Sequence, residues 1–247
     1  MKWLWLPLLS VVLMAPAVAA QVKVLSGGAV ETGLAASIEA YRKETGADVK
    51  IEYATAPMIR QKVIGGESAD IVIAPAAVAD ELVKTGKLDP ASSVAMGRVG
   101  VGVGVRNGAP KPDVSNTEAV KRAVLEAESV VFNRASAGLY LEKLFERLGI
   151  AEQVKAKETR YPDTNAVIAH VLKGKGKEIT FAPITELMLY KDKGLDYVGP
   201  LPADIQNYTS YVAAMSSAAA NREGAAALLN YFSGPASKNL FREKGVE

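Results

Sequence analysis

The sequence has no cysteine and a single histidine, His170, among its 247 residues. Without cysteine the chain can form no disulfide, thiolate nucleophile or cysteine-ligated metal site. One histidine also excludes a metal or haem site that needs several histidines. We therefore expect neither a metal nor another cofactor.

An excess of charge of one sign is lacking as well. The chain has 29 Lys and Arg against 27 Asp and Glu, which gives a formal net charge of +2. A nucleic-acid partner is not expected, because neutralising phosphates requires a basic stripe. Hydrophobic residues make up 49% and charged residues 23%, a composition typical of globular proteins. The length suits one large domain or two small ones.

A long hydrophobic run is missing, and the apolar segment near the N-terminus is short. Lys2 precedes an apolar stretch from Leu4 to Met14, which Pro7 and Ser10 interrupt. An Ala-Val-Ala sequence then precedes Ala20 and Gln21, which is typical of a signal peptide cleavage site. We predict a signal peptide over residues 1–20 and a periplasmic mature protein. An uncleaved anchor is the alternative, although the run is short for a membrane span.

Beyond that segment, strand-like and helix-like patterns alternate. The stretch from Ala69 to Ala74 is nearly all apolar, as expected of a strand buried on both faces of a parallel sheet. Alternation of this kind predicts an α/β fold with mainly parallel sheets. The other segments predicted as strands are 22–25, 49–53, 130–132 and 179–181, and those predicted as helices are 29–43, 76–84, 117–128, 138–148, 165–172, 222–232 and 235–244.

The segment from Val99 to Val105 alternates valine and glycine, so one face of the predicted strand has no side chains. Bare backbone on one face indicates close approach by another part of the chain. A second extended stretch, Tyr208 to Ala214, follows about 100 residues later. We interpret the two stretches as paired connections between two lobes, and the alternative is an ordinary buried strand.

Five turns are candidates for chemistry, and four of them directly follow a predicted strand. The carboxyl ends of strands are where open α/β sheets place ligands. Glycines and helix starts there expose backbone N–H groups that favour anions. Taken singly, each turn is more often a structural cap. The five turns are Ser26-Gly27-Gly28-Ala29, Thr55-Ala56-Pro57, Asn133 to Gly138, Asp163-Thr164-Asn165 and Ala182-Pro183-Ile184-Thr185.

Catalytic constellations are weak. The chain has no G-x-S-x-G elbow of a serine hydrolase. His170 lies within a predicted helix, and we interpret it as a structural or surface residue. Arg60, Arg98 and Arg134 could each clamp a carboxylate through a forked guanidinium. We predict no catalytic residue.

Several sequence blocks resemble the periplasmic solute-binding proteins of the molybdate-binding type, within the type II periplasmic binding proteins. A further block, Leu201 to Thr209, is similar to a divergent sub-branch of that family. The resemblance covers nearly all of residues 22–247. The blocks that carry it are Val22 to Ala29, Gly66 to Ile73, Ser136 to Tyr140 and Tyr231 to Ser237.

The resemblance implies two α/β lobes joined by a two-strand hinge, with a ligand in the cleft between them. It places lobe 1 at residues 21–102 plus 207–247, and lobe 2 at residues 103–206. It also implies that ligand binding closes the lobes and that the closed form docks on an ABC-type membrane permease. We expect the protein to be a monomer.

The resemblance also implies binding residues, with some departures from the family pattern. Ala29 stands where the family has a serine, and Ala182 where it has a tyrosine, so hydroxyl donors for a tetrahedral oxyanion are missing. We therefore expect a small organic anion, with a carboxylate favoured over molybdate. The residues predicted to line the binding site are Ser26, Gly27, Gly28, Ala29, Thr55, Ala56, Arg60, Arg134, Ser136, Ala137, Thr164, Asn165 and Pro183.

An enzyme on the same scaffold is the alternative function. The sub-branch resembles a periplasmic aconitate isomerase, which moves a double bond of a tricarboxylate by proton transfer. Such an enzyme needs a general base near the cleft and cationic groups for three carboxylates. Glu31, Glu186 and His170 are the candidates for that base.

Overall fold

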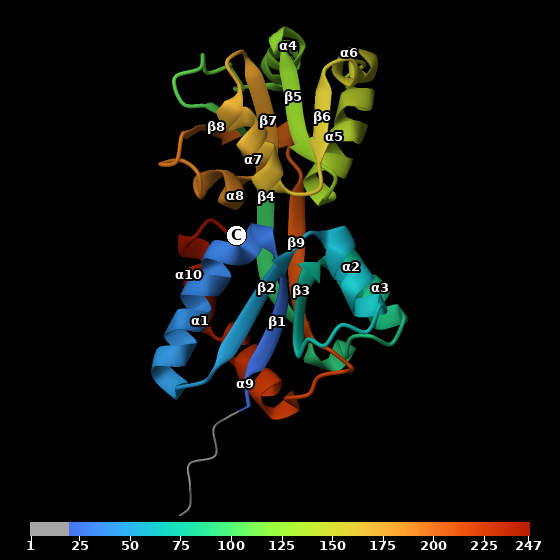
Figure 1. Cartoon of the computed structure of the whole chain (residues 1–247), viewed down its shortest axis with the longest axis vertical. Coiled ribbons are helices and arrows are strands. Elements are labelled where there is room, and N and C mark those ends of the chain that lie inside the picture. Colours follow the sequence, from blue (N-terminus) through green and yellow to red (C-terminus); the bar gives the residue numbers. More distant parts are fainter. Residues whose placement is uncertain (1–19) are drawn as a thin grey trace, which may run out of the picture.

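The computed structural model describes residues 20–247. The predicted signal peptide lies outside the described residues, apart from Ala20. Figure 1 shows two lobes stacked along the long axis of the molecule, with β4 (Val94–Arg106) and β9 (Tyr208–Met215) running through the waist between them. The expected α/β fold of two lobes with a two-strand hinge is confirmed.

Helices flank the sheet of each lobe. Those of lobe 1 are η1 (Gly28–Val30), α1 (Glu31–Thr45), α2 (Ala56–Ile64), α3 (Ala76–Lys84), η2 (Pro90–Ser92), α9 (Arg222–Ser233) and α10 (Pro235–Glu243). Those of lobe 2 are α4 (Thr117–Glu126), α5 (Ser136–Arg147), α6 (Ala151–Lys155), α7 (Thr164–Lys173), α8 (Ile184–Met188) and η3 (Ala203–Ile205). The segments predicted as helices all appear, with ends shifted by a few residues.

The sheets are parallel except where the crossing strands join them. In lobe 1 the strand order is β2-β1-β3-β9-β4, and β1 pairs parallel with β2 and β3. In lobe 2 the order is β4-β7-β5-β6, with β8 on the other side of β4. All the antiparallel pairs involve β4 or β9. The remaining strands are β1 (Val22–Gly27), β2 (Val49–Ala54), β3 (Ile71–Pro75), β5 (Ser129–Asn133), β6 (Glu158–Tyr161), β7 (Glu178–Pro183) and β8 (Leu195–Pro200).

Each lobe has its own apolar core. The strand predicted at 69–74 forms β3, all of whose residues are buried, as a strand covered on both faces requires. In lobe 2 the rings of Phe132 and Phe181 pack edge-on against Phe145, with centroids 6.0 and 6.1 Å from it. Separate cores hold each lobe rigid, so the strand ends at the waist occupy fixed positions within their lobe.

The glycine face of β4 is closely packed, as its pattern predicts. A Cβ on Gly102 would lie 2.8 Å from Tyr197 and 3.0 Å from Ile184, and one on Gly100 would lie 3.2 Å from Gln206. Glycine on this face therefore lets α8 and the chain before β9 approach the backbone of the crossing strand. The division of the chain at residues 102 and 207 stays a prediction.

A side chain continues the strand pairing at the waist. The Val101 N–H donates to Gln206 Oε1 at 2.8 Å, and Gln206 Nε2 donates to the Val101 carbonyl at 3.0 Å. On β4, pairing with β9 ends at Gly100 and pairing with β8 begins at Gly102. Val101 lies between the segments of β4 that pair with β9 and with β8. The Gln206 side-chain amide therefore provides the hydrogen bonds that a neighbouring strand would otherwise provide to Val101.

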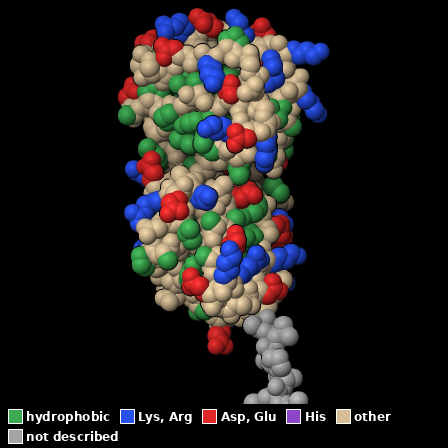
Figure 2. Space-filling view, turned by 90° about the vertical axis from the view of Figure 1, so that its left-hand side faces the viewer, with side chains coloured by type: hydrophobic (Ala, Val, Ile, Leu, Met, Phe, Trp, Pro, Cys, Tyr) green, Lys and Arg blue, Asp and Glu red, His purple; other side chains and the backbone are tan. Residues whose placement is uncertain are grey.

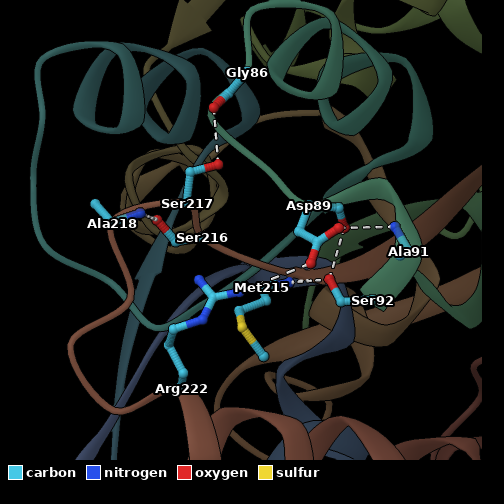
Figure 3. A network of polar contacts seen from close by, with 9 residues as sticks. All are labelled: Gly86, Asp89, Ala91, Ser92, Met215, Ser216, Ser217, Ala218 and Arg222. Carbon is cyan, nitrogen blue, oxygen red and sulfur yellow. Dashed lines mark hydrogen bonds and ion pairs between the residues drawn. The ribbon is translucent and has the colours of Figure 1, made fainter.

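The end of lobe 1 away from the waist is held by a polar network (Figure 3). The Asp89 carboxylate caps η2 by accepting from the Ala91 N–H at 3.0 Å, and it lies 3.9 Å from Arg222 at the start of α9. Ser92 Oγ accepts from the N–H of Met215, the last residue of β9, at 2.8 Å. These contacts fix the far end of β9 and have no part in the cleft.

Among residues 20–247, no helix combines the length and apolar character that a membrane crossing requires.

Candidate functional site

A cavity of about 190 Å³ lies between the two lobes. Its walls come from the carboxyl ends of β1, β2, β3, β5 and β7, from the crossing strands β4 and β9, and from the starts of η1, α2, α5, α7 and α8. The cavity therefore lies where parallel strands of both lobes end, as the sequence predicts for a ligand site.

Ten of the thirteen predicted binding residues line this cavity. They are Gly27, Gly28, Ala29, Thr55, Ala56, Ser136, Ala137, Thr164, Asn165 and Pro183. The predicted turns thus reach one cavity although they are far apart along the chain.

Ser26, Arg60 and Arg134 are not brought to the cavity. The Ser26 side chain is buried in lobe 1, where its hydroxyl donates to the Gly27 carbonyl at 3.1 Å. Arg60 follows the first turn of α2, and its guanidinium pairs with Glu81 on α3 at 2.6 Å. Arg134 is exposed, and only its backbone is fixed, by an N–H bond to the Tyr161 carbonyl. No arginine clamp is therefore present in the described cavity wall.

Several helices that start at the cavity have no side-chain cap, among them α2 in lobe 1 and α5 in lobe 2. Thr55 precedes α2 and Ala135 precedes α5, and neither accepts a bond from the first turn of its helix. By contrast, Asn116, Asp163 and Asn221 cap α4, α7 and α9. Uncapped first turns present N–H groups and the positive end of the helix dipole. In α2 the second residue is Pro57, which has no N–H, so the donors of that turn are Ala56 and Met58. The α2 and α5 starts therefore form a polar, positive environment on the two sides of the cavity.

Hydroxyl and amide groups add further donors and acceptors to the wall. The Asn133 amide donates to Thr164 Oγ1 at 3.0 Å, and the Tyr190 hydroxyl donates to Asn165 Oδ1 at 2.6 Å. Thr55 and Ser136 are half-buried at the starts of their helices. Thr164 and Asn165 are thus held in position by protein partners, whereas Thr55 and Ser136 face the cavity with hydroxyls free to turn towards a ligand.

Three carboxylates in the wall were not predicted as ligand-binding residues. Glu31 lies at the start of α1, Asp163 at the N-cap of α7, and Glu186 on α8. Burial raises the pKa of Glu31, and Lys193 partly offsets this effect. The pKa of Glu186 is raised to about 7, chiefly by burial, with a smaller upward effect from the charges of Glu31 and Asp163 and a downward effect from the Thr164 hydroxyl.

The sequence named Glu31 and Glu186 only as candidate bases for the enzyme alternative. No sequence motif marks either glutamate as a cleft residue, because each lies in the first turn of a helix whose sequence has no distinctive pattern. The third candidate base, His170, is not in the cavity wall, and its Nδ1 lies 2.9 Å from the Tyr161 hydroxyl. A structural role is the simplest interpretation of that histidine.

Aromatic residues complete the wall. Tyr53 and Tyr211 border the cavity, and burial raises the pKa of both phenols above the usual value, so both stay protonated. Lysine and arginine are absent from the wall as far as residues 20–247 define it. Within the same residues, no group of three His, Asp or Glu side chains could hold a metal ion. The cavity therefore offers dipoles, hydroxyls and carboxyl groups.

Comparisons with known proteins agree with this architecture. The family model "Bacterial extracellular solute-binding protein" matches residues 22–247. An aconitate isomerase from Pseudomonas sp is 32% identical over 232 residues, covering 91% of this chain and 86% of that protein.

Solved structures share the fold at low sequence identity. The periplasmic molybdate-binding protein of Azotobacter vinelandii is similar with a TM-score of 0.76 and 14% identity, over 92% of this chain and 98% of that one. The sulfate-binding protein SubI from Mycobacterium tuberculosis H37Rv is similar with a TM-score of 0.72 and 17% identity. This similarity covers 91% of this chain and 85% of that one.

Proposed function

The chain belongs to the bacterial extracellular solute-binding proteins, and from that membership we propose that it captures a small anion in the cleft between its lobes. The captured solute is handed to an ABC-type membrane permease. The lobes move about β4 and β9, and closure removes the anion from water. Exclusion of water strengthens the hydrogen bonds from fixed dipoles to the ligand.

One observation carries this proposal: the starts of α2 and α5 face the same cavity from opposite lobes without a capping side chain. N–H groups at a helix start favour negative charge. An anion that bridges the two starts would satisfy donors from both lobes and so favour the closed form. The Thr55 and Ser136 hydroxyls stand beside these starts and supply two further donors.

The wall composition supports a small organic anion. Its donors are neutral, and its charged groups are acidic, so a ligand of high negative charge would be disfavoured. Ala29 and Ala182 lack the hydroxyls that a tetrahedral oxyanion would use, and each missing bond costs about 1–3 kcal/mol. A carboxylate of low charge therefore fits better than molybdate.

Family membership supports the proposed location and membrane partner. We place the protein in the periplasm after removal of residues 1–20, with the permease as its membrane partner. On the face shown in Figure 2, Lys and Arg alternate with Asp and Glu and form no single-sign stripe, which supports the expectation of no nucleic-acid partner. A monomer is still expected, and size-exclusion chromatography would check it.

A thermal-shift panel tests the proposal. Sulfate, molybdate, acetate, succinate, citrate and trans-aconitate would each be added at increasing concentration to the purified protein. A ligand at 100 times its dissociation constant stabilises the folded state by about 2.7 kcal/mol. We expect a concentration-dependent rise in melting temperature for at least one carboxylate. No rise with any anion would refute anion capture, and a rise with molybdate alone would refute the carboxylate preference.

Two substitutions at one position locate the ligand. Ser136→Ala removes the hydroxyl, and Ser136→Pro removes the hydroxyl and the first N–H of α5. Proline suits this first helical position, and Ala135 before it is extended, as a residue before proline must be. We expect affinity to fall by roughly threefold to tenfold for alanine and further for proline. Thr117→Pro, at the start of α4 outside the cavity, is the control and should leave affinity unchanged.

The second candidate function is isomerisation of a tricarboxylate. It is favoured by the 32% identity to an aconitate isomerase and by Glu186, a carboxyl group in the cleft with a pKa of about 7. Such a group can remove a proton from one carbon and return it to another. The lack of Lys and Arg in the described wall counts against binding three carboxylates.

Incubation with trans-aconitate separates the two functions. Formation of the cis isomer by the purified protein, and its loss in Glu186→Gln, would assign the isomerase. Binding of an anion without turnover over many hours would leave the receptor function. Both isomers are distinguishable by liquid chromatography.

A further inference from the structure

Glu186 is the carboxyl group of the cleft whose interactions are incomplete. Its Oε2 is buried without a hydrogen-bond partner. The other oxygen, Oε1, occupies space above Gly28, where an added Cβ would lie 2.9 Å from it. Glu186 belongs to lobe 2 and Gly28 to lobe 1, so the carboxyl group reaches across the cleft into a gap that the glycine leaves open.

The surroundings of this carboxyl group are acidic. Helix α8 packs against η1 and α1 of lobe 1 and against β4, β7 and β8 of lobe 2. The charges that act on Glu186 are the carboxylates of Glu31 and Asp163. Tyr190 and Tyr211 are the phenols near it, and both stay protonated because burial and the nearby carboxylates raise their pKa. Lys193 acts on Glu31. No cation in the described wall compensates a negative charge on Glu186.

A bound anion would add another negative charge beside this group. An ionised Glu186 would repel that anion and would also repel Glu31 across the lobe interface. A protonated Glu186 has neither effect, and its O–H can donate to the ligand. Thr185, the neighbouring residue on α8, already joins the lobes by donating from Oγ1 to the Ala29 carbonyl at 2.6 Å. Glu186 is therefore held at the cleft whatever its charge.

We propose that Glu186 is the ligand-selecting group of the cleft and captures the anion in its protonated form, donating a hydrogen bond from its carboxyl group to the ligand. Each anion is then taken up together with one proton, which comes from solvent when Glu186 is ionised beforehand. The inference rests on the proposed function of anion capture. It defines the ligand class as anions that present an oxygen acceptor towards α8.

Proton uptake makes affinity depend on pH. Above the pKa of Glu186, the protonated fraction falls tenfold for each pH unit, and the apparent dissociation constant rises by the same factor. Since that pKa is about 7, we expect affinity to be nearly constant below pH 6 and to weaken by about 50-fold between pH 7 and pH 9. Glu186→Gln keeps a donor without a titratable proton, so its affinity should not change over this range.

Titration calorimetry with trans-aconitate, acetate and sulfate at pH 6, 7, 8 and 9 tests the proposal. At pH 8, two buffers of different ionisation enthalpy report the number of protons taken up. The variants are Glu186→Gln and, as the matched control, Glu31→Gln, which removes the other glutamate of the cleft. We expect close to one proton per anion in the unmodified protein and in Glu31→Gln, and none in Glu186→Gln.

The outcomes separate this inference from the function on which it rests. Binding with no proton uptake and a constant affinity would refute the role of Glu186 and leave anion capture intact. The same pH slope in Glu186→Gln would also refute it, since another group would then be titrating. If none of the probes binds even at pH 6, anion capture itself fails and the inference fails with it.

Discussion

The pH dependence of stability gives a direct test of the Glu186 environment without any ligand. In the unfolded chain this carboxyl group titrates at its ordinary value of 4.5, whereas in the folded protein its pKa is about 7. The folded state therefore binds the proton more tightly. The contribution of Glu186 to the free energy of unfolding is therefore largest below pH 4.5. This contribution decreases as the pH rises to 7.

The magnitude follows from the size of the shift. One pKa unit corresponds to 1.36 kcal/mol, so a shift from 4.5 to about 7 amounts to about 3–4 kcal/mol before screening. Because the carboxyl group borders a cleft that admits water, screening reduces this value, and we expect a loss of roughly 1–3 kcal/mol between pH 5 and pH 8. In a protein of this size that change lowers the melting temperature by about 2–12 °C.

Glu186→Gln separates this contribution from those of the other titrating groups. Urea unfolding followed by circular dichroism would be measured for both proteins between pH 5 and pH 9. We expect the free energy of unfolding of the variant, relative to that of the unmodified protein, to rise by roughly 1–3 kcal/mol from pH 5 to pH 8. A difference that stays constant with pH would refute the reasoning, because Glu186 would then titrate alike in both states.

Substitutions at three further positions test the waist and the contact between the lobes. Gln206→Ala should cost about 1–3 kcal/mol in urea unfolding and speed amide exchange at Val101, because the N–H loses its partner; Gln206→Glu keeps the acceptor and should retain the protection. Thr185→Val should cost about 1 kcal/mol and enlarge the radius of gyration measured by X-ray scattering, because the bond to Ala29 between the lobes is lost; an unchanged radius would contradict this role. Gly102→Ala should cost about 1–3 kcal/mol in thermal unfolding, because its Cβ would lie 2.8 Å from Tyr197.

Regular structure in this protein could be predicted because its signals are local. The alternation of apolar segments predicted the main strands and helices, and the valine and glycine pattern of β4 predicted a closely approached strand. The same reasoning missed α2 and α8, which begin at two of the predicted turns. It also missed α6, β6 and β8, which are short or have mixed burial. It also placed the start of α5 at Gly138, two residues after its actual start at Ser136.

The sequence by itself determined the architecture and the turns that meet at the cleft, because strand ends and helix starts are set by neighbouring residues and by backbone geometry. Only the tertiary structure decided which charges face the cleft. Arg60 turns to Glu81 on a neighbouring helix, while Glu186 crosses from lobe 2 to a space above Gly28 in lobe 1. Both depend on contacts between residues far apart in the chain, and local patterns carry no information about such contacts. The cleft therefore has carboxyl groups where forked guanidinium groups were expected.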